Sequence, residues 1–237
     1  LEKIFCANPI PIRDIQLVTC RIARQEGFIP IRVPERTTGR RIAVVGGGPG
    51  GVAAAIVLLE QGPAVTIFDK GSRLGGTPRA IIPEARYSGS EEEIDAILKP
   101  ALEAGRLAVK FGRSFGDKDL ALSDLRRDFN AVFLAFGLGK AGSGNREAGV
   151  TDALTFLNEA KSGQLKKSET PVAVVGGGNT AMDAAVTARR LGVEDVYVLY
   201  RRSFGEMPAW PAERDRLLES GAHLLVLTQP TGTVHDA

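Results

Sequence analysis

One glycine-rich stretch, IAVVGGGPGGVAAAI at residues 42–56, contains the pattern G-x-G-x-x-G at Gly46, Gly48 and Gly51. The first glycine allows a tight turn, the second lets the backbone approach a pyrophosphate, and the third lets a helix pack closely on a strand. Free N–H groups at the start of that helix attract anions. An apolar run precedes the pattern and a small-residue run follows it, so the stretch predicts a nucleotide-binding turn. A glycine-rich turn that binds nothing is the alternative.

An acidic residue follows this turn at the appropriate distance. Asp69 ends the next apolar run, 18 residues after Gly51. A carboxylate there can accept hydrogen bonds from ribose hydroxyls, and it repels a 2′-phosphate. The first turn therefore suits FAD or NAD and disfavours NADP. Alternatively, Asp69 is only an exposed residue at the end of a strand.

A second stretch, PVAVVGGGNTAMDAAV at residues 171–186, repeats the turn in its alanine variant at Gly176, Gly178 and Ala181. Arg201 and Arg202 follow the next apolar run, where the first stretch has its carboxylate. Guanidinium groups bind phosphate through paired, charge-assisted hydrogen bonds, which is the chemistry that the 2′-phosphate of NADP requires. The opposite charges indicate two different cofactors rather than one duplicated site. A solvated basic corner is the alternative for the two arginines.

Other residues near the second turn have two interpretations each. Asn179 and Thr180 could cap the following helix or touch a phosphate. Met207 and Trp210 could pack over a cofactor or belong to the ordinary core. Hydride transfer between two cofactors requires no acid–base residue, so we name no catalytic side chain. We also name no metal ligand.

The elements around the two turns alternate between strands and helices, which predicts an α/β fold with two Rossmann-like dinucleotide-binding domains. We expect a helical arm and linker at 1–40, an FAD-binding domain at 41–145 and an NADP-binding domain at 146–237. Residues 71–90 are rich in Gly, Pro and Arg and are expected to form a loop. Strands are expected at 41–45, 64–68, 107–111, 131–136, 172–175, 196–200 and 223–227, and helices at 11–26, 52–61, 91–104, 180–191 and 212–220.

Composition excludes several classes of protein. The 237 residues carry a net charge of +2, which gives no basic surface for nucleic acid. The two cysteines, Cys6 and Cys20, form neither a disulfide framework nor a C-x-x-C pair, and Cys20 is expected in the core. Apolar runs fall short of the roughly 20 residues that span a bilayer. No signal peptide is recognisable, so we expect a cytoplasmic protein.

Four further strings carry a specific resemblance: LGG at 74–76, IIPEAR at 81–86, VVGGGNTAMDAA at 174–185 and YRRSFGEMPAW at 200–210. In this order, with the first turn, they resemble the flavin-containing, NAD(P)H-dependent proteins related to the small subunit of glutamate synthase. The same module occurs in dihydropyrimidine dehydrogenase and in bifurcating ferredoxin–NADP oxidoreductases. The IIPEAR and EMPAW stretches are most similar to the selenate reductase branch. The resemblance covers roughly residues 6–228.

The resemblance implies that hydride passes from NADPH to FAD and that electrons leave through iron–sulfur clusters to a partner domain or subunit. It places Arg86 beside the flavin, and residues 206–209 along the NADPH site. The implied FAD contacts are Gly46, Gly48, Pro49, Gly50, Gly51, Asp69, Lys70, Gly75, Gly76, Arg86 and Gly137. The implied NADPH contacts are Gly176, Gly178, Asn179, Thr180, Ala181, Arg201 and Arg202.

In the family that this chain resembles, the polypeptide returns from the NADP domain to finish the FAD domain. We therefore expect both domains to be incomplete here, so that the chain is a fragment or another chain supplies the rest. Cys6 is expected to be an orphan cluster ligand or an inert thiol. Two other functions stay open: a non-catalytic fragment or interaction subunit, and a regulatory domain that binds one nucleotide. The presence of Asp69 with Arg201 and Arg202 argues against the second.

Overall fold

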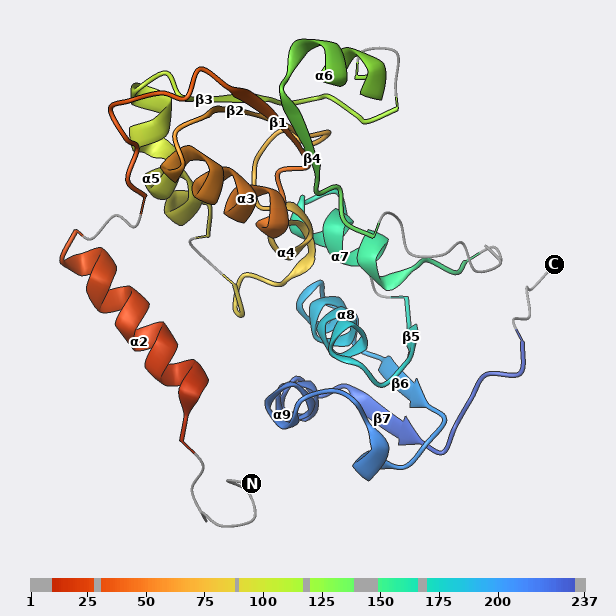
Figure 1. The fold of residues 1–237 in the computed structure, drawn as a ribbon. Coiled ribbons are helices and arrows are strands. Elements are labelled where there is room, and N and C mark those ends of the chain that lie inside the picture. The colour runs from red at the N-terminus through yellow and green to blue at the C-terminus, as the bar shows by residue number, and fades with distance from the viewer. Residues whose placement is uncertain are drawn as a thin grey trace. The chain divides into compact units, whose positions relative to one another are not determined.

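The computed structural model describes residues 10–27, 31–87, 90–116, 120–138, 149–165 and 170–232. The chain divides into two compact units, of which the first contains residues 1–74 and 91–135 and the second contains residues 75–90 and 136–237 (Figure 1). Each unit combines parallel strands with helices, which confirms the predicted α/β class. Residues 75–90, expected within the first domain, group with the second unit. The expected boundary at 145 lies outside the described residues.

The first unit contains a four-stranded sheet in the order β3–β2–β1–β4, with all neighbouring strands parallel. Strand β1 is interior, and its residues 42–45 are buried, as expected where helices cover both faces. Val45 pairs with Phe68, so the carboxyl ends of β1 and β2 lie side by side. The strands are β1 (Arg41–Val45), β2 (Ala64–Phe68), β3 (Leu107–Lys110) and β4 (Ala131–Leu134), and the helices are α2 (Ile12–Gln25), α3 (Pro49–Glu60), α5 (Ser90–Glu103) and α6 (Leu122–Asp128).

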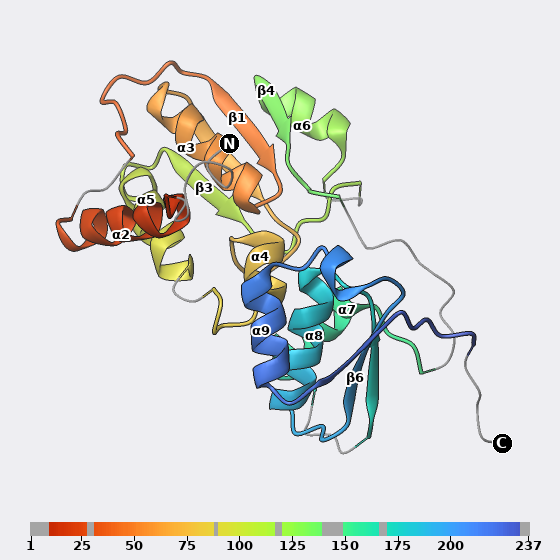
Figure 2. The same ribbon diagram turned by 90° about the horizontal axis from the view of Figure 1, so that it is seen from below.

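Separate hydrophobic clusters cover the two faces of this sheet. Val44 of β1 packs with Leu59 of α3 and Leu98 of α5. The next residue, Val45, belongs to a second cluster with Leu125 of α6. Figure 2 shows α3 and α6 on opposite sides of β1 and β4. Successive side chains of β1 thus point to opposite faces of the sheet and pack against the helices on each face. The first glycine turn connects β1 to α3, which belongs to one of these helical layers.

The second unit contains a three-stranded parallel sheet in the order β5–β6–β7. One face is covered by helices, where Val198 of β6 packs in a cluster with Leu217 of α9. The other face exposes Val175, Tyr197 and Leu225. The strands are β5 (Val172–Val175), β6 (Val196–Tyr200) and β7 (His223–Val226), and the helices are α4 (Gly76–Ile81), α7 (Ala153–Lys161), α8 (Asn179–Arg190), the 3₁₀ turn η1 (Phe204–Glu206) and α9 (Pro211–Glu219).

The predicted strands and helices are confirmed, with ends that differ by no more than three residues. Helix α4 contradicts the expectation of a loop throughout 71–90. Its Pro78 is the third helical residue, where a missing N–H removes no helical hydrogen bond. Helices α6 and α7 were not predicted.

The N-terminal helix α2 differs from expectation in its packing. Cys20 is exposed, so the prediction that it belongs to the core is wrong. Its apolar neighbours Ile15, Val18 and Ile22 are exposed as well, because the described residues leave this side of α2 uncovered. Cys6 lies outside the described residues. None of the helices in the described ranges is long and apolar enough to cross a membrane.

Candidate functional site

The first glycine turn has the backbone geometry that its pattern predicts. Gly46 has φ +108°, a left-handed conformation that glycine adopts most readily. Gly48 precedes α3, which starts at Pro49, so the turn lies at the end of the helix where the first N–H groups have no partner within the helix. A Cβ atom on Gly51 would lie 1.8 Å from the carbonyl oxygen of Gly46. The third glycine is therefore required for the contact between turn and helix.

Asp69, at the end of β2, is fixed by two backbone groups. The N–H of Gly47 donates to its Oδ2 at 2.6 Å, and the N–H of Gly71 donates to its Oδ1 at 2.7 Å. Asp69 is half-buried, so it is more than an exposed strand-end residue. Each carboxylate oxygen keeps a further lone pair for another donor. Gly47 was not among the predicted site residues, although it stands in an unbroken run of three glycines. A Cβ atom on Gly47 would lie 2.5 Å from Cδ2 of Leu74, so glycine is required there as well.

The other residues that the resemblance implied for FAD lie in different parts of the chain. Lys70 is exposed directly after Asp69, in the first unit. Gly75, Gly76 and Gly137 all have positive φ, at +112°, +58° and +72°, and group with the second unit. Their left-handed conformations explain why glycine occurs at these three positions.

The second glycine turn repeats the backbone conformation of the first. Gly176 has φ +143°, and Gly178 precedes α8 in an extended conformation. A Cβ atom on Gly176 would lie 3.4 Å from the Cβ of Ala181, an ordinary contact. The alanine therefore fits here. Gly177 was not among the predicted site residues, but a Cβ atom there would lie 2.5 Å from the ring of Tyr200.

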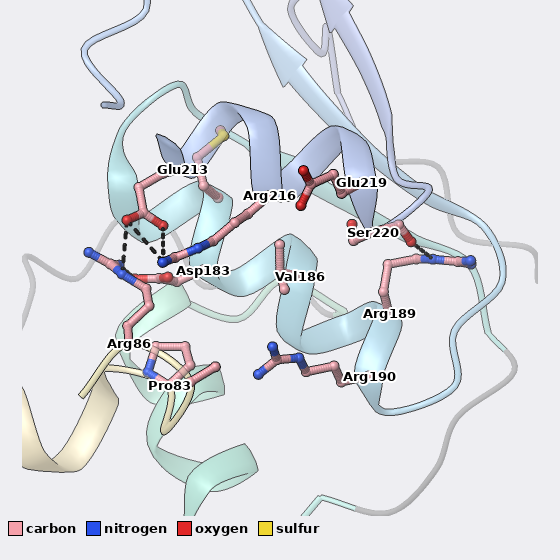
Figure 3. Close-up of a pocket in the computed structure, with 12 residues that line it drawn as sticks. Pro83, Arg86, Asp183, Val186, Arg189, Arg190, Glu213, Arg216, Glu219 and Ser220 are labelled. Atoms are coloured by element: carbon pink, nitrogen blue, oxygen red, sulfur yellow. Dashed lines mark hydrogen bonds and ion pairs between the residues drawn. The ribbon is translucent and has the colours of Figure 1, made fainter. Parts of the chain in front are cut away.

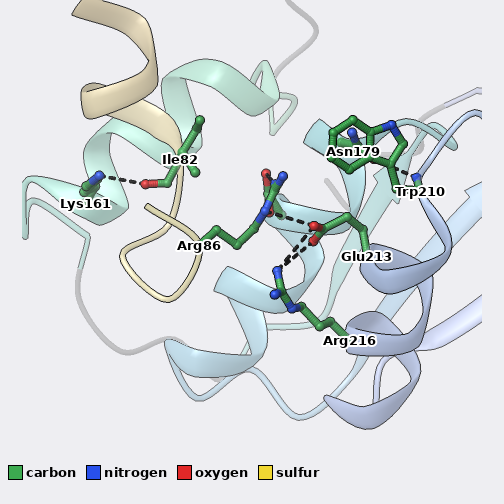
Figure 4. Close-up of polar contacts among 8 residues, drawn as sticks. Ile82, Arg86, Lys161, Asn179, Trp210, Glu213 and Arg216 are labelled. Atoms are coloured by element: carbon green, nitrogen blue, oxygen red, sulfur yellow. Dashed lines mark hydrogen bonds and ion pairs between the residues drawn. The ribbon is translucent and has the colours of Figure 1, made fainter. Parts of the chain in front are cut away.

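The segment after η1 is tied to the start of α8. The N–H of Ala209 donates to the carbonyl oxygen of Gly177 at 3.0 Å. The N–H of Trp210 donates to Oδ1 of Asn179 at 2.9 Å (Figure 4). Of the two interpretations that the sequence left open for Asn179, the structure does not have the cap: Gly178 is the residue before α8, and the side chain of Asn179 accepts the hydrogen bond from Trp210 instead. Thr180 is exposed beside it.

Glu206, which we expected to line the NADPH site, has a local role in this structure. Its carboxylate accepts hydrogen bonds from the hydroxyl and the N–H of Ser203 at 2.7 and 3.1 Å. These bonds lower the pKa of the Glu206 carboxyl, and the nearby charge of Arg202 acts in the same direction. Glu206 therefore shapes the connection between β6 and α9.

A crevice of about 340 Å³ lies beyond the carboxyl ends of the second sheet, and Arg201 and Tyr200 contribute to its wall. The hydroxyl of Tyr200 donates to the carbonyl oxygen of Glu206 at 2.9 Å, which fixes the ring. Leu227 has φ +53°, and its N–H donates to the carbonyl oxygen of Arg202. This bond holds the loop after β7 against the arginine pair. The lining residues are Val175, Gly176, Leu199, Tyr200, Arg201, Thr228, Gln229 and Pro230.

The model of the pyridine nucleotide-disulphide oxidoreductase family matches residues 40–230. The chain belongs to this family. It is 35% identical to the NADP(+)-dependent formate dehydrogenase subunit beta of Moorella thermoacetica, over 84% of this chain and 29% of that protein. It is 33% identical to the glutamate synthase [NADPH] small chain of Azospirillum brasilense, over 90% of this chain and 47% of that protein. The glutamate synthase relationship inferred from the sequence motifs is thus confirmed.

Other comparisons support the same family and fold. The Escherichia coli O157:H7 protein YgfK is 38% identical over 80% of this chain and 18% of its own length. FprA from Mycobacterium tuberculosis, solved in complex with NADPH, has a TM-score of 0.60 at 20% identity over 76% of this chain and 47% of that chain. The chain spans less than half the length of these four proteins. The similarity to FprA supports the fold alone.

Within the family fold, Arg86 occupies a buried ion-pair network of the second unit. Its guanidinium donates to Asp183 of α8, and its Nε lies 3.1 Å from Oε1 of Glu213 in α9. Arg216 also pairs with Glu213, at 3.2 Å (Figures 3 and 4). Burial raises the pKa of the Asp183 carboxyl, and the hydrogen bond from Arg86 partly opposes that rise.

This network anchors residues 82–86 to α8 and α9. A second tie lies at the end of α4, where Nζ of Lys161 donates to the carbonyl oxygen of Ile82 at 2.6 Å. The network forms one wall of a pocket of about 420 Å³ (Figure 3). The side chain of Arg86, which the resemblance placed beside a flavin, is thus held by two carboxylates of its own unit.

Proposed function

We propose that this chain is an electron-transfer module of a flavin-dependent oxidoreductase, with FAD on the first glycine turn and NADPH on the second. When bound, NADPH supplies a hydride and FAD accepts it. The carrying observation is that two well-formed turns have side chains of opposite charge just beyond the neighbouring strand, Asp69 in one and Arg201 in the other. The sequence placed the arginine pair at the position of the carboxylate, but the strand register gives that position to Tyr200, and Arg201 follows it by one residue. Their roles are to bind and orient the two cofactors, because the cofactors carry the redox chemistry.

The first turn fits the diphosphate and ribose of FAD. A Cβ atom on Gly50 would meet no atom within 4 Å, so the start of α3 has room for a phosphate. The N–H bonds from Gly47 and Gly71 hold Asp69 in place, and its remaining lone pairs can accept ribose hydroxyls. Lys70, Gly75, Gly76, Arg86 and Gly137 stay proposed flavin contacts, on the family resemblance alone.

The second turn fits the diphosphate of NADPH. A Cβ atom on Gly178 would also meet nothing within 4 Å, which leaves the start of α8 open to a phosphate. The crevice beside Arg201 can take the adenosine end, where a guanidinium would bind the 2′-phosphate. Two of the relatives carry NADP or NADPH in their names, in agreement with this assignment.

We further propose that electrons pass from the flavin to an iron–sulfur domain or subunit. Two relatives are named as a subunit or small chain of larger enzymes, which supports a module that works within an assembly. We propose the cytoplasm as its compartment.

The decisive experiment is a visible absorption spectrum of the purified chain, recorded before and after addition of NADPH without oxygen. We expect flavin bands that bleach with NADPH. A chain that stays colourless after incubation with FAD, or flavin bands that NADPH leaves unchanged, would contradict the proposal.

The double variant Arg201→Ala with Arg202→Ala tests the assignment of NADPH to the second turn. We expect NADPH affinity to fall at least about 30-fold, since charge-assisted hydrogen bonds contribute roughly 1.5–3 kcal/mol each, while NADH affinity changes less than about threefold. Binding calorimetry measures both. The matched control, Arg126→Ala with Arg190→Ala, removes two exposed arginines that do not line the crevice. An equal loss for NADPH and NADH in the first variant would overturn the assignment.

A further inference from the structure

The tryptophan at the start of α9 differs from its neighbours in exposure. Trp210 is 53% exposed, whereas Met207 and Ala209 are 6% and 3% exposed. The sequence left two interpretations for Met207 and Trp210, contact with a cofactor or packing in the core. Met207 belongs to the core, and Trp210 does not. A large aromatic side chain exposed beside a nucleotide-binding turn is a candidate contact for a planar ligand.

The backbone of Trp210 has a fixed position at the helix start that would hold a phosphate. Its N–H donates to Asn179, the first residue of α8, and the preceding N–H of Ala209 donates to Gly177. Figure 4 shows the hydrogen bond between the backbone of Trp210 and Asn179. Pro211 follows as the first residue of α9 and limits the backbone on the other side. Trp210 is therefore an anchored residue with an exposed ring.

The two halves of a bound dinucleotide would meet different parts of this unit. The crevice beside Arg201 can take the adenosine half, and Trp210 does not line that crevice. The diphosphate would sit at the start of α8, next to Asn179. The part of the ligand still without a contact is the nicotinamide half, and the exposed aromatic ring adjacent to the diphosphate position is Trp210.

We propose that the indole of Trp210 contacts the nicotinamide half of the bound dinucleotide, an assignment that rests on the proposed NADPH binding. The oxidised nicotinamide ring is a planar cation, and the face of an indole attracts such cations more strongly than other aromatic side chains do. Trp210 thereby adds affinity for the redox-active half of the cofactor, while Arg201 selects its adenosine half.

The chain contains one tryptophan, so its fluorescence reports on this position alone. The test compares NADP⁺ with 2′,5′-ADP, which lacks the nicotinamide half. We expect both to bind by calorimetry, and only NADP⁺ to quench Trp210, after correction with a free tryptophan derivative in the same solutions. Trp210→Ala should weaken NADP⁺ binding about tenfold, the size of one lost aromatic stacking contact. Binding of 2′,5′-ADP should stay unchanged, and Trp210→Phe should keep most of the NADP⁺ affinity.

The outcomes separate this inference from the proposed function. Binding of both ligands without a change in fluorescence, together with equal affinities in Trp210→Ala, would overturn the contact and leave NADP binding intact. Quenching by 2′,5′-ADP as strong as quenching by NADP⁺ would place Trp210 at the adenosine half and also overturn it. If neither ligand bound, both the proposed function and the contact would fail.

Discussion

Replacing Arg86 by methionine is expected to lower the free energy of unfolding by about 3–5 kcal/mol at neutral pH, the usual cost of breaking a buried ion pair. The side chains of Asp183 and Glu213 are only 10% and 6% exposed, and Arg86 is their shared partner. Methionine keeps the unbranched apolar stem but leaves Asp183 without the counter-charge of Arg86. Urea unfolding followed by circular dichroism measures the loss as a lower midpoint at unchanged slope.

A control variant at Arg216 shows whether the loss of stability depends on the burial of the ion pair or only on the loss of a positive charge. Arg216 also pairs with Glu213, but its side chain is 46% exposed. Solvent screens such a pair, so Arg216→Met should cost no more than about 1 kcal/mol. If Arg86→Met also cost less than about 1 kcal/mol, the network would not anchor residues 82–86.

The pH dependence of the Arg86→Met deficit gives a second readout. Burial holds the pKa of Asp183 above its ordinary value of 3.8 in the folded chain, and Arg86 opposes this shift. Without Arg86 the pKa rises further. The folded variant then binds more protons than its unfolded state across a wider pH window, and its stability falls as pH rises through that window. The deficit should therefore be largest near neutral pH and shrink towards pH 4. A deficit that is independent of pH would point to lost packing instead of unpaired charge.

The sequence predicted those features that depend on neighbouring residues. The two turns follow from glycines within six positions of one another, and positive φ at Gly46 and Gly176 confirms their conformation. The strands follow from short apolar runs, and β5 and β6 have the predicted bounds. In these cases the local backbone requirement and the tertiary structure agree.

Features that depend on distant partners could not be predicted in this way. Arg86 and Asp183 are 97 residues apart, and the sequence does not indicate which of many carboxylates an arginine meets. The role of Asp69 could be predicted only in part. Its distance in sequence from the glycines predicted a position at the turn, but its hydrogen bond with the N–H of Gly47 depends on how two loops meet. Helix α4 was missed since its glycines and Pro78 are typical of loops, although a proline is tolerated in the first turn of a helix.

The variant Gly51→Ala is expected to disrupt the first turn and to lose at least about 3 kcal/mol of stability, above the usual range for an overpacked methyl group. The added Cβ would lie 1.8 Å from the carbonyl oxygen of Gly46 and 2.9 Å from its carbonyl carbon. Both are backbone atoms, so a side-chain rotation cannot relieve the collision. Under the proposed function, the purified variant should also carry less flavin per chain, which absorbance after purification measures.

Gly50→Ala is the matched control, because it adds the same methyl group one residue earlier in the same helix. A Cβ atom there meets nothing within 4 Å, so stability should stay equal or rise by up to about 1 kcal/mol. The second turn has an alanine, Ala181, at the position of Gly51, so the expected effect comes from the surroundings of Gly51 and not from alanine as such. If Gly51→Ala were as stable as Gly50→Ala, Gly51 could not lie as near to the carbonyl group of Gly46 as the structure has it. The close contact between the turn after β1 and the start of α3 would then not exist, and it could not explain why the third residue of the pattern is glycine.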